Sequence, residues 1–283
     1  MKRAGIFFMG VVIMLITITG CQPRAVVPIA PTEAAQKFQS IIDEEFKIPL
    51  TTKETGKTFW VYVPVKENFF IYKAAPNMGT NPSTPKASTK PSLRFVEARF
   101  DTQQFIVNYD ISLSTNYATD PGYKTDYSDD FKKKQQYIMS ALQRAFEGSA
   151  QPPRFIVMVI ADITNGVEME SIIYFDDLLR AMSLVANLPQ EEFAKRYVTE
   201  FRGNTEIVDN DKGTHLNYRD IAMEEFLSRQ IENRVRFKYQ QSAFPPSEES
   251  RDEILNAAKE ALGAYKFTDY KKIEVRNLNL ETN

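Results

Sequence analysis

The feature that most constrains the fold is an apolar run in the middle of the chain, residues 155–163, followed by Asn165-Gly166. A short apolar run rich in β-branched residues is typical of a strand buried on both faces. Asn-Gly is a strong hairpin signal, because a type I′ turn needs positive φ at both central positions. We therefore expect a central strand that turns at Asn165-Gly166 into a second strand, residues 167–175.

Strand patterns also occur earlier in the chain. Residues 59–65 and 69–74 are β-branched and aromatic runs separated by three polar residues, which predicts a hairpin. Within residues 93–114, apolar and polar residues alternate, which predicts one buried and one solvent-facing side. Residues 76–92 contain four prolines and hardly any apolar residue, so we expect a mobile surface loop there.

Helical spacing of apolar residues alternates with these strands. It predicts helices at residues 33–46, 129–147, 176–182, 190–202, 219–231 and 248–262, with Thr32, Ser128, Asp176 and Ser247 as N-caps. Val235, Phe237 and Tyr239 alternate with basic residues and predict a strand, as do residues 273–280. The sequence thus predicts an α+β fold of antiparallel sheets with amphipathic helices packed on one side, ending in an αβαβ segment.

Charge and cysteine content exclude several classes of protein. The chain has 35 basic and 37 acidic residues, so it lacks the basic excess of a nucleic-acid-binding protein. One cysteine and one histidine exclude a disulfide framework and most metal centres built on these residues. We expect no cofactor and no nucleic-acid partner.

The N-terminus has the pattern of an export signal. Residues 1–3 carry two positive charges, and residues 4–18 carry none. This stretch is shorter than the about 20 residues that span a bilayer as a helix. It ends with Ile-Thr-Gly-Cys at residues 18–21, which resembles the lipobox of bacterial lipoproteins.

The resemblance implies cleavage before Cys21 and attachment of fatty acyl chains such as palmitate, which anchor the protein to a membrane of the cell envelope. Each buried CH₂ group would contribute about 0.8 kcal/mol to that anchoring. Gln22 follows the cysteine in place of Asp, which in enterobacterial lipoproteins resembles export to the outer membrane, on its periplasmic face in a Gram-negative cell. The alternative is an inert cysteine behind an ordinary secretory signal.

These features predict the organisation of the whole chain. Residues 1–20 are the signal peptide, and residues 21–31 are the lipidated cysteine and a proline-rich tether. Residues 32–125 form a β-rich region, and residues 126–283 form an α+β region. The two regions are either separate or one continuous domain.

Two segments carry residue types that can serve catalysis or metal binding. Asp209 and Asp211 superficially resemble the DxDGT motif of haloacid-dehalogenase-like phosphatases, but Lys212 breaks its register. Asp and Asn beside glycine most often form a turn, so a weak cation site is the alternative for Asp209 and Asp211. His215, the only histidine, is interpreted as a surface or cap residue, and no nucleophile motif accompanies it.

Paired charges offer two further candidates. Asp176 and Asp177 are adjacent carboxylates, which we interpret as helix-capping residues. In the predicted strand, Arg234, Arg236 and Lys238 would lie on one face over about 13 Å, as a candidate contact for an anionic partner. The alternative is a solvated face whose charges pair with acidic residues of neighbouring helices.

The sequence therefore favours a membrane-anchored envelope lipoprotein that acts as a binding or assembly module without catalysis. Its expected partners are the membrane, through Cys21, and an envelope protein or glycan. The alternative function is an envelope hydrolase that acts on glycan or peptide through paired carboxylates. A purely structural subunit of a larger complex is a third reading.

Overall fold

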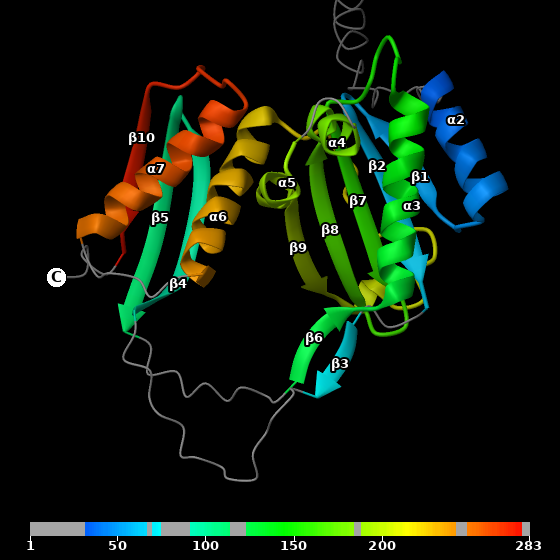
Figure 1. The fold of residues 1–283 in the computed structure, drawn as a ribbon, viewed down its shortest axis with the longest axis horizontal. Coiled ribbons are helices and arrows are strands. Elements are labelled where there is room, and N and C mark those ends of the chain that lie inside the picture. Colours follow the sequence, from blue (N-terminus) through cyan, green and yellow to red (C-terminus); the bar gives the residue numbers. More distant parts are fainter. Residues whose placement is uncertain are drawn as a thin grey trace, which may run out of the picture. The chain divides into compact units, whose positions relative to one another are not determined.

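A computed structural model describes residues 32–66, 70–74, 91–113, 123–183, 188–241 and 248–278. The described strands form a five-stranded sheet in the order β1-β2-β7-β8-β9, a three-stranded sheet β10-β5-β4 and a two-stranded ribbon β3-β6 (Figure 1). Their bounds are β1 Thr51–Thr55, β2 Thr58–Val65, β3 Phe70–Ala74, β4 Pro91–Asp101, β5 Gln104–Leu113, β6 Tyr123–Tyr127, β7 Phe155–Asp162, β8 Val167–Tyr174, β9 Val198–Gly203 and β10 Lys272–Asn277.

The helices come from the segments whose apolar residues recur at helical spacing. They are α2 Glu33–Ile41, which continues as a π-helical turn Ile42–Phe46, α3 Asp129–Phe146, α4 Phe175–Met182, α5 Gln190–Arg196, α6 Met223–Gln241 and α7 Glu248–Ala264. Two predicted N-caps are confirmed, because Thr32 Oγ1 accepts from the backbone N–H of Ala35 and Ser128 Oγ from that of Phe131, both at 3.2 Å. The predicted α+β class is confirmed. The sheets are mostly antiparallel, with parallel pairs β2–β7 and β5–β10.

The predicted central hairpin is present as β7 and β8. Every residue of β7 is buried, and the two strands pair from Phe155 opposite Tyr174 to Asp162 opposite Val167. The type I′ turn is wrong, because only Gly166 of the Asn-Gly pair has positive φ. Asp162 shapes the turn instead: its Oδ1 accepts from the backbone N–H of Asn165 at 2.9 Å, and its carbonyl accepts from that of Gly166 at 2.9 Å.

The predicted hairpin of residues 59–65 with residues 69–74 is wrong. β2 pairs with β1 on one side and with β7 on the other, whereas β3 pairs with β6. The physical reason is that nearly all of β2 is buried, and a strand buried on both faces needs a neighbour at each edge. Strands β2, β3, β4 and β5, which form from the predicted strand regions, therefore divide among three sheets.

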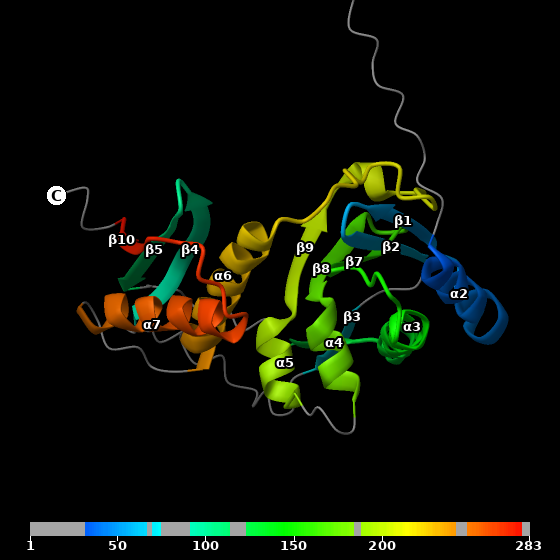
Figure 2. The same cartoon turned by 90° about the horizontal axis from the view of Figure 1, so that it is seen from above.

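Three apolar clusters pack among the described residues. One lies between the five-stranded sheet and α2, α3 and α4, which share one side of that sheet in Figure 2. Another packs Phe226 of α6 and Ile207 against the opposite face of the sheet. The third lies between the three-stranded sheet and helices α6 and α7. Helix α6 therefore contributes to the cores of both sheets.

Helix α6 corrects the prediction for residues 234–239, which are helical and not a strand. Leu227, Ile231 and Val235 recur every four residues and are fully buried, which outweighs the alternation of residues 235–239. The C-terminal part consequently runs helix, helix, strand, and the predicted αβαβ segment is wrong. The helix predicted after Pro189 ends at Arg196, because the following residues pair with β8 as strand β9.

Helix α6 also lies between two strand edges. Glu232 Oε1 accepts from the backbone N–H of Ala98 in β4 at 2.8 Å, and Arg236 donates to the carbonyl of Val96 at 3.4 Å. On its other side, Asn233 Nδ2 donates to the carbonyl of Lys195 in the last turn of α5 at 2.8 Å, and α5 leads directly into β9. An unpaired strand edge is a template for unwanted pairing, and α6 covers the β4 edge at these groups.

Residues 31–283 form one compact unit. The pairs β2–β7 and β5–β10 join residues 32–125 to residues 126–283. Cys21, Ser247 and residues 75–90 of the predicted loop lie outside the described residues, while Pro91 begins β4. In the part of the chain that the structure describes, no helix combines the length and the apolarity that crossing a membrane requires.

Candidate functional site

A pocket of about 640 Å³ opens on the face of the five-stranded sheet that carries Trp60, opposite the face covered by α2 and α3. Strands β2, β8 and β9, the segment 204–221 and helix α6 all contribute to its walls. The lining residues are Trp60, Glu168, Glu170, Arg202, Gly203, Asn204, Glu206, His215, Leu216, Asn217, Arg219, Ile221 and Arg229.

Two glutamates of β8 form the deepest charged part of the wall. Glu168 and Glu170 are two residues apart and thus point to the same face of the sheet, with side chains only 5% and 7% exposed. Across the strand pair, Glu170 lies directly opposite Glu200 of β9. Like charges in that position are destabilising, and buried carboxylates cost free energy unless they are paired.

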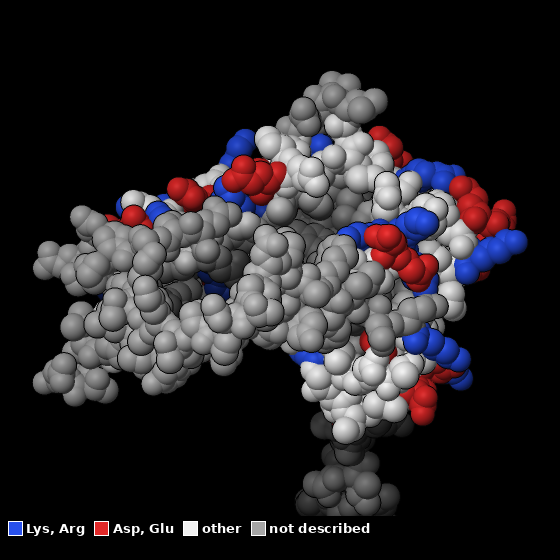
Figure 3. Space-filling view, turned by 60° about the horizontal axis from the view of Figure 1, so that its bottom comes forward, with Lys and Arg blue, Asp and Glu red and all other residues white. Residues whose placement is uncertain are grey.

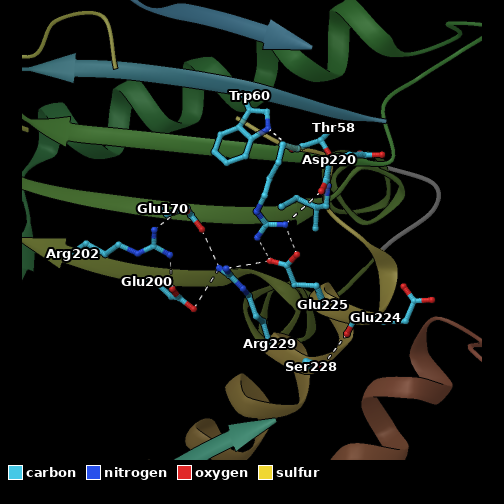
Figure 4. A network of polar contacts seen from close by, with 12 residues as sticks. Thr58, Trp60, Glu170, Glu200, Arg202, Asp220, Glu224, Glu225, Ser228 and Arg229 are labelled. Atoms are coloured by element: carbon cyan, nitrogen blue, oxygen red, sulfur yellow. Dashed lines mark hydrogen bonds and ion pairs between the residues drawn. The ribbon is translucent and has the colours of Figure 1, made fainter. Parts of the chain in front are cut away.

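Two arginines offset this repulsion (Figure 4). Arg229 of α6 places its guanidinium 3.0 Å from the Glu170 carboxylate and 3.5 Å from that of Glu200. Arg202 of β9 lies 3.3 Å from Glu170 and 3.1 Å from Glu200. The two contacts of Arg229 tie α6 to the sheet at the edge of the pocket.

A third arginine completes the network. Arg219 forms a two-pronged contact with Glu225, whose carboxylate also lies 3.3 Å from Arg229. Burial by itself raises the pKa of Glu225, but the hydrogen bonds and charges of the two arginines outweigh it and hold that pKa below its ordinary value. On the described part of the face in Figure 3, basic and acidic side chains are intermixed.

The prediction of a surface position for His215 is wrong, because its side chain is only 7% exposed. Nδ1 lies 2.9 Å from Asn210 Nδ2, and Nε2 lies 2.8 Å from Glu168 Oε2. Asn210 Oδ1 accepts from the backbone N–H of Thr214, which fixes the orientation of the amide. The Asn210 amide therefore faces Nδ1, and the Glu168 carboxylate accepts a hydrogen bond from Nε2.

The segment around Asp209 and Asp211 is a turn in which the side chain of Asn210 bridges the two ends. Gly213 has φ of 64°, and a Cβ there would lie 2.7 Å from the Tyr62 ring, so glycine is required. Among the described residues, no group of three or more His, Cys, Asp or Glu side chains is placed to hold a metal ion.

The predicted common face of Arg234, Arg236 and Lys238 is wrong, because a helix of about 3.6 residues per turn points residues two apart in different directions. Arg234 is buried against Glu192 at 2.7 Å. Arg236 pairs with Glu232 at 3.3 Å and Lys238 with Glu253 at 3.4 Å. These contacts show the pairing with acidic residues of helices that the alternative interpretation predicts.

The capping role of Asp176 and Asp177 is also wrong. Tyr174 occupies the N-cap position of α4, and no side chain caps that helix. Asp177 is 4% exposed and accepts hydrogen bonds from Arg196 at 2.8 Å and from the Tyr265 hydroxyl at 2.7 Å. It belongs to a buried ion cluster that also contains Glu192 and Arg234.

Sequence reasoning missed Glu168 and Glu170. The signal was present, because a strand predicted beside the central strand carries two acidic residues on the face where Ile172 is buried. Arg229 belongs to the basic residues that precede the predicted strand, yet nothing local indicated that it would meet β8. Comparisons with protein-family models, curated proteins and solved structures found no match to this chain.

Proposed function

We propose that this chain is a lipid-anchored cell-envelope protein whose folded body is a binding module, with the pocket over β8 as its ligand site. The lipobox-like residues ending at Cys21 support the anchor, and Gln22 favours the periplasmic face of the outer membrane in a Gram-negative cell. A volume of about 640 Å³ is within the range of about 300–1,000 Å³ typical of ligand pockets. Its partners are an envelope protein or glycan and the membrane itself.

One observation carries the proposal for the pocket. Glu168 and Glu170 are nearly buried carboxylates in a largely buried strand, and both line the pocket. Placing them there costs desolvation free energy that an apolar pair would avoid. Departures of this kind from local stability are typical of functional sites.

A hydrolase built on the same carboxylates is less well supported. A hydrolase of this kind needs two carboxylates, each with a free position within hydrogen-bond reach of the substrate. Glu170 is held by Arg202 and Arg229, and both ring nitrogens of His215 are already bonded. These contacts favour recognition over proton transfer.

The anchor is tested by replacing Cys21 with serine in the full chain. We expect intact-mass measurement of membrane-extracted wild-type protein to give a chain that begins at Cys21 and carries acyl groups. The Cys21→Ser variant should be an uncleaved or soluble precursor. A wild-type N-terminus downstream of Cys21 without lipid would contradict the anchor.

The ligand site is tested by filling the pocket. Asn217 is exposed and lines it, so Asn217→Trp should occupy the volume without breaking the ion network. Lys212→Trp, on the same segment but outside the lining, is the matched control. Native mass spectrometry of the full chain in detergent with envelope extract should show a small-molecule adduct on wild type and control only; equal adducts on all three proteins, or none, would contradict the site.

A further inference from the structure

The pocket region holds more negative charge than its arginines neutralise. Arg202, Arg219 and Arg229 contact the carboxylates of Glu170, Glu200 and Glu225, three charges against three. Two further carboxylates line the pocket, those of Glu168 and Glu206. Glu168 bonds to the His215 imidazole and Glu206 to the Asn204 amide at 3.2 Å, so no arginine or lysine of the described residues forms an ion pair with either carboxylate, although the Arg202 charge acts on Glu168 from further away.

Glu168 also has a hydrogen-bonding position unused. Its side chain is only 5% exposed, and its Oε2 accepts a hydrogen bond from His215 at 2.8 Å. No donor of the described residues lies within hydrogen-bond distance of Oε1. Oε1 is not among the fully buried side-chain atoms that lack a hydrogen-bond partner. It therefore retains access to solvent, and we place that access on the side of the pocket that Glu168 lines.

Building on the proposed function, we propose that the pocket binds a small organic cation whose primary ammonium group donates a hydrogen bond to Glu168 Oε1. A charge-assisted bond of this kind is about twice as strong as one between neutral groups. A carboxylate withdrawn from water strengthens it further, because the surrounding dielectric is low. The second unmatched carboxylate, Glu206, favours a ligand with a second positive charge or a polar tail.

Other ligand classes fit this wall less well. An anion would meet two unmatched carboxylates, and the three guanidinium groups that attract it are already paired. A neutral polyol could donate to Oε1 but would leave the charge excess in place. A metal ion would need more ligands than the described residues bring together here.

The first test uses the wild-type full chain in detergent and a pair of probes of similar shape. Isothermal titration calorimetry with 1,4-diaminobutane should give saturable binding, and 1,4-butanediol should bind at least about 10-fold more weakly. Equal affinity for the two probes would overturn the proposal. This comparison needs no variant and so does not depend on how a variant folds.

The second test locates the contact. Glu168→Gln keeps an oxygen for His215 but replaces the free acceptor with an amide, so the affinity for 1,4-diaminobutane should fall about 10- to 100-fold. Glu206→Gln removes the same charge from the exposed part of the pocket and should cost about threefold or less. Equal losses in the two variants would show a general field effect and overturn the assigned contact.

Two sources of the ammonium group are separated by glucosamine and N-acetylglucosamine, which differ in that group. An amino sugar is supported as the source if glucosamine binds more tightly than N-acetylglucosamine and this preference is lost in Glu168→Gln. Binding of the diamine alone supports a polyamine. Failure of every amine would overturn this inference. The pocket proposal would still be tested separately, by whether Asn217→Trp abolishes the adduct from envelope extract.

Discussion

Helix α6 carries two ion clusters, and they differ chiefly in access to solvent. The pocket cluster consists of Glu170, Glu200, Arg202, Arg219, Glu225 and Arg229. The sealed cluster consists of Asp177, Glu192, Arg196, Arg234 and Tyr265. Arg229 is 19% exposed and Arg234 is 7% exposed, although about one and a half helical turns separate them.

The sealed cluster joins four helices. Asp177 comes from α4, Arg196 from α5, Arg234 from α6, and Tyr265 directly follows α7. The Tyr265 ring lies under the Arg196 guanidinium at 5.4 Å, and burial, together with the Asp177 charge, raises the pKa of the Tyr265 hydroxyl. These charges fix how the helices pack.

The pocket cluster uses the same residue types at an open wall. Arg202 and Arg219 are 46% and 43% exposed, so their remaining N–H groups face water or a ligand. The comparison teaches that ion pairing alone does not identify a functional site. Exposure to solvent distinguishes the two kinds of pair. Buried pairs hold helices together, while partly exposed pairs can also shape a binding surface.

The largest expected effect breaks the sealed cluster. Asp177→Ala leaves Arg196 buried without one carboxylate and Tyr265 without its acceptor, so the free energy of unfolding should fall by about 3–5 kcal/mol. Denaturant unfolding of the full chain measures it. Exposed Asp176→Ala is the neighbouring control, with an expected change within about 0.5 kcal/mol; similar losses for both would remove the distinction between the clusters.

A smaller effect is expected in the pocket cluster. Arg229→Gln leaves the opposed Glu170 and Glu200 with Arg202 as their shared cation, and should cost about 1–3 kcal/mol. In a Glu200→Gln background the same change should cost less, because the repulsion between the two carboxylates is gone. A double-mutant cycle measures the coupling; additive losses would argue against this account of Arg229.

The smallest expected effect is a lower acid sensitivity of the unfolding free energy when one glutamate of either cluster is replaced. Burial raises the pKa of Glu192 and of Glu225, but their arginine partners outweigh it, so both folded-state pKa values lie below 4.5. Such groups stabilise the fold above about pH 4.5, and this contribution is lost as pH falls through the lowered values. Glu192→Gln and Glu225→Gln should each flatten the decline of unfolding free energy below about pH 4.5; an unchanged slope would contradict the pairing.

Local patterns in the sequence predicted the elements better than their partners. The buried run of β7, its return as β8 and the caps Thr32 and Ser128 are short-range features, and the structure confirms them. The partners of β2 depend on residues far away in the chain, which no local pattern encodes. For residues 234–239, helical and strand periods overlap, and burial against β4 selects the helix.

The candidate site was harder to predict for the same reason. Glu168 and Glu170 are two residues apart in one predicted strand, but the pocket exists only where Arg229, His215 and β9 meet them. A lone histidine in a polar segment gives no sign that a carboxylate will meet it. Only the tertiary fold brings these groups together.

The pairing of β10 with β5 has a consequence for the order of folding. Residues 272–277 lie in register beside residues 104–109, so the three-stranded sheet cannot be completed until almost the whole described chain is available. Contacts of such high sequence separation form slowly, because a long loop must close before they gain any stability. During synthesis, the β4–β5 hairpin would therefore wait for α6, α7 and β10 with its apolar face uncovered and prone to aggregation.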